Sequence, residues 1–346
     1  MNRIERLAGR LEEPLLVTNL VNVRYLTGLA SSNAAVLVDP AGDATLYTDF
    51  RYAEAASAVE GVAFQRTPRY VLAALAELLS GRRIAVEAKS LSLADADALR
   101  AGGVELVSTT GVVEAQRAVK EPGELELLRR AASISDQVYA ELAQERFVGR
   151  TETELAWWLE QAWHDAGADG PGFDAIVAFG ENGARPHAHV RDLPVQADTL
   201  VIVDAGCSVE GYRSDCTRTF FTGAPEGRLR ELYDLCLEGQ LAGLAAVAPG
   251  ARGRDVDAVS RVAIEAAGMG ELYGHGLGHG VGLDVHEEPT LRPESSSVLE
   301  EGNVVTVEPG IYVAGDVGVR IEDMVVVTAD GCERLTAVTK DPVQVA

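Results

Sequence analysis

The chain has 346 residues, 47% of them hydrophobic, and its 53 acidic and 30 basic residues give a net charge of −23. This length exceeds what a single hydrophobic core usually organises, so we expect two domains. A surface this acidic repels nucleic acids and anionic membranes, and we therefore expect neither as a partner.

Several signals that would assign a different function class are missing. No apolar run reaches the ~20 residues of a membrane-spanning helix, and no signal-peptide core follows the N-terminus, so we expect a cytoplasmic protein. None of the lysines follows a glycine, which excludes a G-x-x-x-x-G-K phosphate-binding loop. The 4 cysteines form no C-x-x-C pair, and we expect them to be reduced.

The N-terminal third alternates strand and helix signals, which is typical of a small α/β domain. The expected elements are strands at 34–38, 44–47 and 84–87 and helices at 52–59, 71–79 and 93–99. No compact chemical motif falls within this part of the chain.

A second domain is indicated where Lys120-Glu121-Pro122-Gly123-Glu124 interrupts the pattern. A proline near a helix start, with acids in the first turn, is typical of the opening of a helix. Thr151 and Glu154 form a capping-box pattern that begins a further helix, which Gly167 ends. We therefore divide the chain into residues 1–116 and residues 117–346.

In the second domain strands and helices segregate along the chain, which predicts an α+β fold with a curved antiparallel sheet. The expected elements are strands at 199–204, 212–221, 303–308 and 319–327 and helices at 228–247 and 254–267.

A glycine-rich stretch stands between these elements: Gly274-His275-Gly276-Leu277-Gly278-His279-Gly280-Val281-Gly282. So many glycines destabilise a helix by about 1 kcal/mol each, so we expect an irregular strand or loop that passes close to another part of the backbone. Three of the 6 histidines, His275, His279 and His286, fall here, which makes a metal site the first hypothesis.

Four carboxylates could complete such a site. Asp204 and Asp215 lie on consecutive strands of an expected hairpin, and an even register would place both on one face. An odd loop without a bulge would place them on opposite faces. Glu308 and Glu322 flank a second hairpin-like pair, and His279 supplies a nitrogen.

Each of these residues alone has an ordinary structural explanation, since an acid before Ala-Gly or Pro-Gly often ends a strand. Together they are four acids among Val and Ile, where an unpaired charge costs several kcal/mol. Two divalent cations bridged by carboxylates would resolve their repulsion, and oxygen-rich ligands with one histidine favour Mn²⁺ or Co²⁺. The reaction class that this predicts is hydrolysis.

The chain resembles the proline-specific metallopeptidases, prolidase (Xaa-Pro dipeptidase) and aminopeptidase P, over nearly its whole length. The motifs that support the resemblance are, in chain order, Asn22-Val23-Arg24-Tyr25-Leu26-Thr27-Gly28, Thr48-Asp49-Phe50-Arg51-Tyr52, Val203-Asp204-Ala205-Gly206, Ser214-Asp215-Cys216-Thr217-Arg218-Thr219, Gly276-Leu277-Gly278-His279-Gly280-Val281-Gly282, His286-Glu287-Glu288-Pro289, Val307-Glu308-Pro309-Gly310-Ile311-Tyr312 and Val319-Arg320-Ile321-Glu322-Asp323. The resemblance implies a creatinase/prolidase-like α/β domain at residues 1–116, a pita-bread catalytic domain at residues 117–346, and a homodimer.

For the metals, the resemblance implies two divalent ions per chain, with Mn²⁺ expected and Co²⁺ or Zn²⁺ as alternatives. Asp204 would bind the first ion, Asp215 and Glu322 would bridge the two, and His279 and Glu308 would bind the second. Glu308 would also relay a proton.

For the substrate, a small Xaa-Pro peptide, the resemblance implies further roles. His187 would lie near the leaving group, His286 would donate to the scissile carbonyl or the developing oxyanion, and His275 would line the pocket. Arg320 would orient Glu322.

The two enzyme classes that the chain resembles differ in whether the substrate continues beyond the proline. A dipeptidase must bind the C-terminal carboxylate with a cation, and many dipeptidases of this family have an arginine directly after His-Glu-x-Pro. This chain has Thr290 there, so Arg51, Arg24 or Arg292 would have to replace it, including from a second subunit. We expect a dipeptidase, with aminopeptidase P as the alternative.

More distant alternatives are less well supported. Methionine aminopeptidase lacks such an N-terminal domain. A non-catalytic binding protein of the same fold, or the metal-free creatinase, would lack metal ligands that are all present here.

Overall fold

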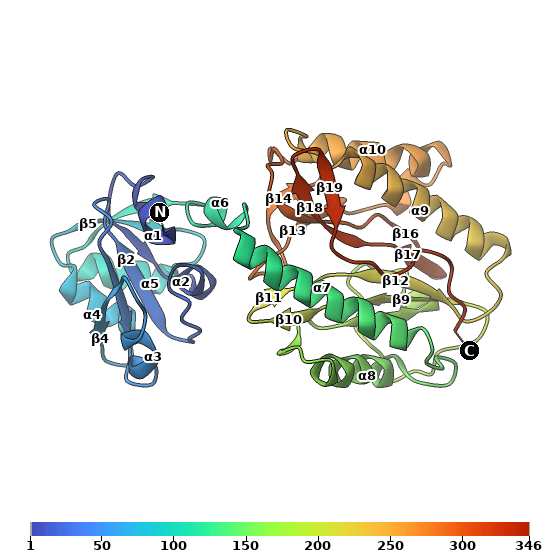
Figure 1. Ribbon diagram of the computed structural model, residues 1–346, viewed down its shortest axis with the longest axis horizontal. Coiled ribbons are helices and arrows are strands. Elements are labelled where there is room, and N and C mark those ends of the chain that lie inside the picture. Colours follow the sequence, from blue (N-terminus) through green and yellow to red (C-terminus); the bar gives the residue numbers. More distant parts are fainter. Residues whose placement is uncertain (1, 346) are drawn as a thin grey trace. The chain divides into compact units, whose positions relative to one another are not determined.

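The structure, a computed structural model, describes residues 2–345. Its internal contacts divide it into two compact units, and the chain passes from the first to the second between Arg117 and Ala118 (Figure 1). Among the described residues, no helix is long and apolar enough to cross a membrane.

The N-terminal unit is built on a six-stranded mixed sheet in the order β4-β3-β2-β1-β5-β6. Strand β2 pairs antiparallel with β1 and β3, whereas β3–β4, β1–β5 and β5–β6 are parallel. The strands are β1 (Leu15–Val17), β2 (Ala34–Val38), β3 (Ala44–Thr48), β4 (Ala63–Arg66), β5 (Arg83–Glu87) and β6 (Glu105–Thr109). The helices are α1 (Arg3–Ala8), α2 (Leu20–Thr27), α3 (Ala53–Ser57), α4 (Val71–Leu78), α5 (Leu93–Ala101) and α6 (Glu114–Arg117).

The expected α/β class of this unit is therefore confirmed, although the sequence did not reveal every element. Strands β1, β4 and β6 and helices α1 and α2 were not expected. Strand β1 has only three residues, all buried, and β4 and β6 are edge strands that bury few apolar side chains. Such segments lack the period-two alternation that identifies a longer strand.

Four helices surround the sheets of the C-terminal unit, with α9 and α10 on one side of the strands and α8 on the opposite side (Figure 1). They are α7 (Pro122–Leu142), α8 (Glu152–Asp165), α9 (Gly227–Ala246) and α10 (Gly253–Ala266). The expected capping box of α8 is confirmed, since the Thr151 hydroxyl accepts from Glu154 N–H and the Glu154 carboxylate accepts from Thr151 N–H. Pro122 opens α7, as expected.

All strand pairs of the C-terminal unit are antiparallel, which confirms the α+β class. Its sheets have the orders β12-β9-β8, β14-β13-β15-β18-β19, β11-β10-β7 and β16-β17. The strands are β7 (Gly170–Pro171), β8 (Ile176–Phe179), β9 (Leu200–Asp204), β10 (Cys207–Val209), β11 (Tyr212–Arg213), β12 (Thr217–Phe221), β13 (Gly278–Gly280), β14 (Glu287–Leu291), β15 (Val304–Val307), β16 (Gly310–Val313), β17 (Val317–Arg320), β18 (Asp323–Thr328) and β19 (Gly331–Arg334).

Two expected strands of this unit are wrong as continuous elements. The segment 212–221 divides into β11 and β12, which belong to different sheets, and 319–327 likewise divides into β17 and β18. Asp215 lies in the first break and Glu322 in the second. The apolar pattern continues across both breaks because the residues on either side are buried, so it gives no sign that the chain changes sheet.

Candidate metal centre

The acidic residues of the predicted site all lie at strand ends. Asp204 is the last residue of β9, Asp215 precedes β12 by two residues, Glu308 follows β15, and Glu322 lies between β17 and β18. His279 is the central residue of β13. Strand ends allow a side chain to turn inward without interrupting a ladder of backbone hydrogen bonds.

The expected antiparallel pairing of the strands that carry Asp204 and Asp215 is confirmed, but the connection between them is not a simple turn. Strand β9 pairs with β12, and Asp204 lies opposite Thr217, two residues after Asp215. Strands β10 and β11 lie between the two acids in the chain, and Asp215 lies in the irregular segment just before β12.

The structure nevertheless brings these side chains together. Ligand atoms of Asp215, His279 and Glu322 all lie within 4.8 Å of one another. The Nε2 atom of His279 is 3.1 Å from Glu308 Oε1 and 3.7 Å from Asp215 Oδ2. Asp204 Oδ1 is buried and has no hydrogen-bond partner among the described residues. A buried carboxylate oxygen without a partner, beside three further acids, fits a cation ligand.

The electrostatics of the cluster call for added positive charge. Burial raises the pKa of Asp215 and Glu322 well above the usual range, and repulsion from the neighbouring acids raises it further. Burial opposes the His279–Glu308 ion pair, yet the pairing raises the pKa of His279 to about 9 and lowers that of Glu308 to about 2. A divalent cation would stabilise the carboxylates in their charged forms and would displace the proton from His279.

Arg320 connects to two of the acids. Its Nη2 donates to Asp204 Oδ2 at 2.6 Å, and its Nε donates to the Thr217 hydroxyl at 3.1 Å. That hydroxyl donates to Glu322 Oε2 at 2.7 Å. Arg320 therefore reaches Glu322, which the resemblance expects it to orient, through Thr217, and it contacts Asp204 directly. Thr217 belongs to one of the motifs that support the resemblance, but no role was predicted for it, since a buried threonine in a strand is ordinary.

A second arginine supports the cluster from the other face of β12. Arg218 donates to the backbone oxygens of Thr217 and Glu322 and, at 2.8 Å, to Asp323 Oδ1. Its remaining donors bind the backbone oxygens of Val338 and Thr339, in the C-terminal segment.

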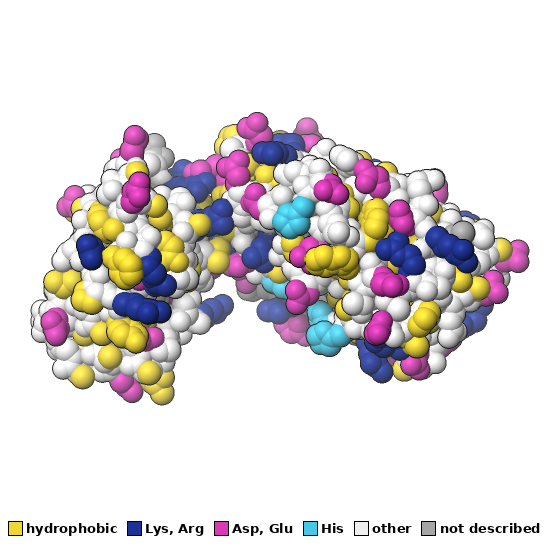
Figure 2. Space-filling view, turned by 90° about the horizontal axis from the view of Figure 1, so that it is seen from below, with side chains coloured by type: hydrophobic (Ala, Val, Ile, Leu, Met, Phe, Trp, Pro, Cys, Tyr) yellow, Lys and Arg dark blue, Asp and Glu magenta, His cyan; other side chains and the backbone are white. Residues whose placement is uncertain are grey.

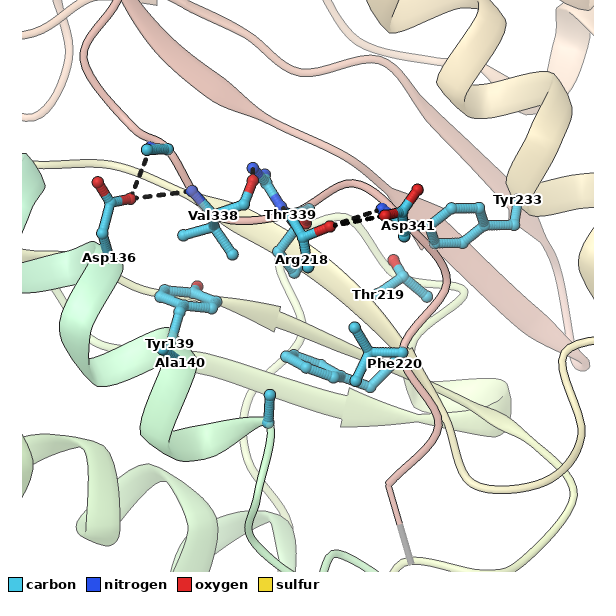
Figure 3. Close-up of a pocket in the computed structure, with 13 residues that line it drawn as sticks. Asp136, Tyr139, Ala140, Arg218, Thr219, Phe220, Tyr233, Val338, Thr339 and Asp341 are labelled. Carbon is cyan, nitrogen blue, oxygen red and sulfur yellow. Dashed lines mark hydrogen bonds between the residues drawn. The ribbon is translucent and has the colours of Figure 1, made fainter.

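This arginine lies in the wall of an apolar pocket of about 260 Å³, together with Tyr139, Phe220 and Val338 (Figure 3). The Arg218 donors are all directed at protein oxygens, so the pocket wall offers no free positive group from this side chain. Its part is to hold the backbone that presents Glu322.

Two of the predicted substrate residues lie at the cluster. His275 Nε2 is 2.9 Å from the Tyr312 hydroxyl, which also accepts from Arg320 at 2.8 Å. The His286 ring stands edge-on to that of His279, with centroids 4.3 Å apart. Beside it, Glu287 forms a buried ion pair of 2.7 Å with Lys120, which holds the loop in place.

The other two predicted substrate residues are His187 and Arg51. His187 is exposed and lines a surface pocket of about 480 Å³; the preceding Pro186 oxygen accepts from Arg320 at 3.3 Å. Figure 2 shows histidine side chains at the surface of the C-terminal unit. Arg51 belongs to the N-terminal unit, where its Nε and Nη2 donate to Asp49.

The glycine-rich stretch owes its composition to close packing, as expected. A Cβ atom built on Gly278 would overlap the Thr306 oxygen, and one built on Gly280 would overlap the Glu288 oxygen. The Thr306 hydroxyl accepts from His279 N–H at 3.1 Å and donates to Glu308 at 3.0 Å. Glycine at 278 therefore allows one threonine to hold two predicted ligands.

We expect Gly278→Ala to lower metal affinity and activity by about 10- to 100-fold, the usual cost of disturbing the groups that orient a ligand. The added methyl group would displace Thr306, and with it His279 and Glu308. Isothermal titration with Mn²⁺ measures the effect. Gly274→Ala is the matched control, because a Cβ there meets nothing within 4 Å. Unchanged Mn²⁺ affinity in Gly278→Ala would contradict this explanation.

Comparisons with known proteins give consistent results. The model of metallopeptidase family M24 matches residues 126–329, and that of the creatinase/prolidase N-terminal domain matches residues 3–119. The Xaa-Pro dipeptidase of Pyrococcus furiosus is 31% identical over 98% of this chain and 99% of its own length.

Two solved structures are similar throughout. The Xaa-Pro dipeptidase from Bacillus anthracis has a TM-score of 0.94 and 34% identity, covering 99% of this chain and 98% of its own. The X-Pro aminopeptidase from Thermotoga maritima has a TM-score of 0.89 and 32% identity, covering 99% and 100%.

Proposed function

This chain belongs to metallopeptidase family M24, with a creatinase/prolidase N-terminal domain and a pita-bread C-terminal domain, and from that premise we propose that it is an Xaa-Pro dipeptidase. The observation on which the proposal depends is the convergence of Asp215, His279 and Glu322 within 4.8 Å, beside the unpartnered Oδ1 of Asp204. Close similarity to a protein named Xaa-Pro dipeptidase over the full chain supports the substrate class.

We assign the metal ligands by residue. Asp204 and the bridging Asp215 and Glu322 would hold one divalent ion, and the same bridging pair with His279 and Glu308 would hold the other. Bound ions of this kind polarise a carbonyl and lower the pKa of a water molecule. The oxygen-rich set favours Mn²⁺, with Co²⁺ or Zn²⁺ as alternatives.

The protein's own side chains supply orientation and proton transfer. Arg320 holds Asp204, and Thr217 holds Glu322, so both carboxylates are fixed before substrate binds. Glu308, hydrogen-bonded to Thr306, accepts the proton of the attacking water and passes it to the proline nitrogen as the peptide C–N bond breaks. His286, adjacent to His279, donates to the carbonyl oxygen as charge develops there.

This arrangement suits a proline peptide. An Xaa-Pro bond is a tertiary amide, so it has no N–H for an enzyme to bind at that position. Recognition must instead come from the free amine, the carbonyl oxygen and the ring, with His187 and His275 beside the ring. The metal centre and these histidines can position all three.

The related candidate is aminopeptidase P, which the similarity to an X-Pro aminopeptidase and the Thr290 position both favour. The discriminating experiment compares Ala-Pro with Ala-Pro-Ala, using enzyme loaded with Mn²⁺, Co²⁺ or Zn²⁺. We expect the higher kcat/KM on Ala-Pro, with Mn²⁺ giving the most active enzyme. A higher value on Ala-Pro-Ala would assign aminopeptidase P instead. No turnover, with less than about one ion bound per chain, would favour a binding protein.

We also propose that the enzyme acts as a cytoplasmic homodimer, on the strength of the family resemblance. Sedimentation equilibrium of the purified protein would test the dimer. A monomer at micromolar concentration would count against it.

A further inference from the structure

A dipeptidase needs a cation for the C-terminal carboxylate of its substrate, and this requirement rests on the proposed function. That carboxylate is two bonds from the scissile nitrogen, so the cation must lie beside the residues that contact the scissile bond. The surface pocket at His187 does not supply it. Its lining includes Glu160 and Asp174 and contains neither lysine nor arginine.

The cations closest to the metal centre are already occupied. Arg320 is bound to Asp204, and Lys120 is bound to Glu287. Arg51, in the N-terminal unit, donates from Nε and Nη2 to Asp49. A substrate carboxylate would have to compete with the acid that each of these cations already binds, and a buried charge left without its partner is costly.

Arg213 is different. It is partly buried at the end of β11, and its side chain makes no hydrogen bond or ion pair with any residue that the structure describes. The other arginines of the C-terminal unit that share this property among the described residues are exposed; they are Arg185, Arg252 and Arg292. A partly buried guanidinium without a counter-charge is a ready site for an anion.

The direction of Arg213 follows from its neighbours in the chain. Tyr212 donates to Glu124 at 2.8 Å, and the Ser214 hydroxyl meets that of Ser135 at 2.7 Å, so both side chains point into the core. Alternation along an extended segment then places Arg213 on the same side as Asp215, the predicted bridging ligand.

Arg213 also lies beside the loop that holds His286. Its backbone N–H donates to the Gly282 oxygen at 3.0 Å. This hydrogen bond places Arg213 beside the segment between His279 and His286, the residue expected to contact the scissile carbonyl.

We infer that Arg213 binds the C-terminal carboxylate of the Xaa-Pro substrate and replaces the arginine that is missing at Thr290. Arg213 thereby makes the enzyme select dipeptides. The planar guanidinium can bind a carboxylate through two parallel N–H···O bonds, which also fixes the orientation of the proline ring.

The test compares Ala-Pro with its C-terminal amide, Ala-Pro-NH₂, on Mn²⁺-loaded enzyme. For Arg213→Gln we expect the KM for Ala-Pro to rise roughly 10- to 100-fold, the range for losing a hydrogen bond to a charged group, with little change for the amide. Arg213→Lys should recover part of the loss. Arg252→Gln, another unpaired arginine, is the matched control and should match wild type. Thermal unfolding and Mn²⁺ content should be unchanged in all variants.

Three results would overturn the inference. The KM for Ala-Pro could stay unchanged in Arg213→Gln, both substrates could lose activity equally, or Arg292→Gln could lose the preference for the acid instead. The proposed function fails separately if wild-type enzyme hydrolyses no Xaa-Pro peptide, and that result would overturn both. Normal hydrolysis of Ala-Pro by wild type and by Arg213→Gln would overturn only the role of Arg213.

Discussion

Asp215→Asn is expected to abolish peptide hydrolysis while leaving the fold intact. Asp215 is 4% exposed, and a carboxylate oxygen of Asp215 lies within 4.8 Å of ligand atoms of both His279 and Glu322, so we propose that it bridges two ions. The amide keeps the shape of the side chain but lacks the charge and the second acceptor oxygen. Because metal ions contribute several kcal/mol of transition-state stabilisation, we expect kcat/KM to fall by about a thousandfold or more.

The stabilisation of the folded protein by bound Mn²⁺ distinguishes a loss of metal binding from misfolding. A ligand that binds only the folded protein stabilises it by about 2.7 kcal/mol at a concentration of 100 Kd. Mn²⁺ should therefore raise the unfolding temperature of wild type and have much less effect on Asp215→Asn. Without metal, the variant should be at least as stable as wild type, because one member of a group of mutually repelling buried acids is gone.

The control is Asp234→Asn, which changes an exposed acid on α9 that pairs with Arg230. It should keep wild-type activity and wild-type stabilisation by Mn²⁺. Normal activity in Asp215→Asn would show that the bridging role has been assigned to the wrong residue.

The sequence predicted which residues belong to the metal-centre cluster better than it predicted the strand pairings and hydrogen bonds that bring them together. Acids among Val and Ile residues are costly to bury alone, and that cost, together with the family resemblance, pointed to Asp204, Asp215, Glu308 and Glu322 as a set. The close approach at Gly278 could also be foreseen, since glycine at alternate positions of a strand leaves room for a neighbouring backbone.

These pairings and hydrogen bonds depend on packing between segments that are far apart in the sequence, which local patterns do not reveal. The hairpin expected between Asp204 and Asp215 left out strands β10 and β11, which are too short to show any alternation. The role of Thr217 also depends on Arg320, more than a hundred positions along the chain, so no local pattern could have indicated it. Arg213 was overlooked because nothing near it in the sequence shows that its charge lacks a partner.

Asp323 is the residue whose loss should destabilise the fold most. It is fully buried and accepts hydrogen bonds from Arg218 at 2.8 Å, Lys340 at 2.8 Å and Gln240 at 3.0 Å. Asp323→Ala would leave the Arg218 guanidinium buried without its counter-charge, so we expect the free energy of unfolding to fall by about 3–5 kcal/mol. Since Arg218 also holds the backbone oxygen of Glu322, Mn²⁺ affinity should fall too. Urea unfolding and metal titration measure the two effects, with Asp234→Ala as the exposed control.

Acid provides an independent test of the same ion pairs. Although burial opposes it, the charges of Arg218 and Lys340 lower the pKa of Asp323 to about 2. Because the folded-state pKa lies below the unfolded value of about 3.9, this carboxylate contributes about 2 kcal/mol of stability at neutral pH, and the contribution is lost as the pH falls from about 4 through 2. The difference in unfolding free energy between wild type and Asp323→Asn should therefore shrink over that interval. A difference that stayed constant down to about pH 2 would mean that Asp323 stabilises the fold through its packing and not through its charge.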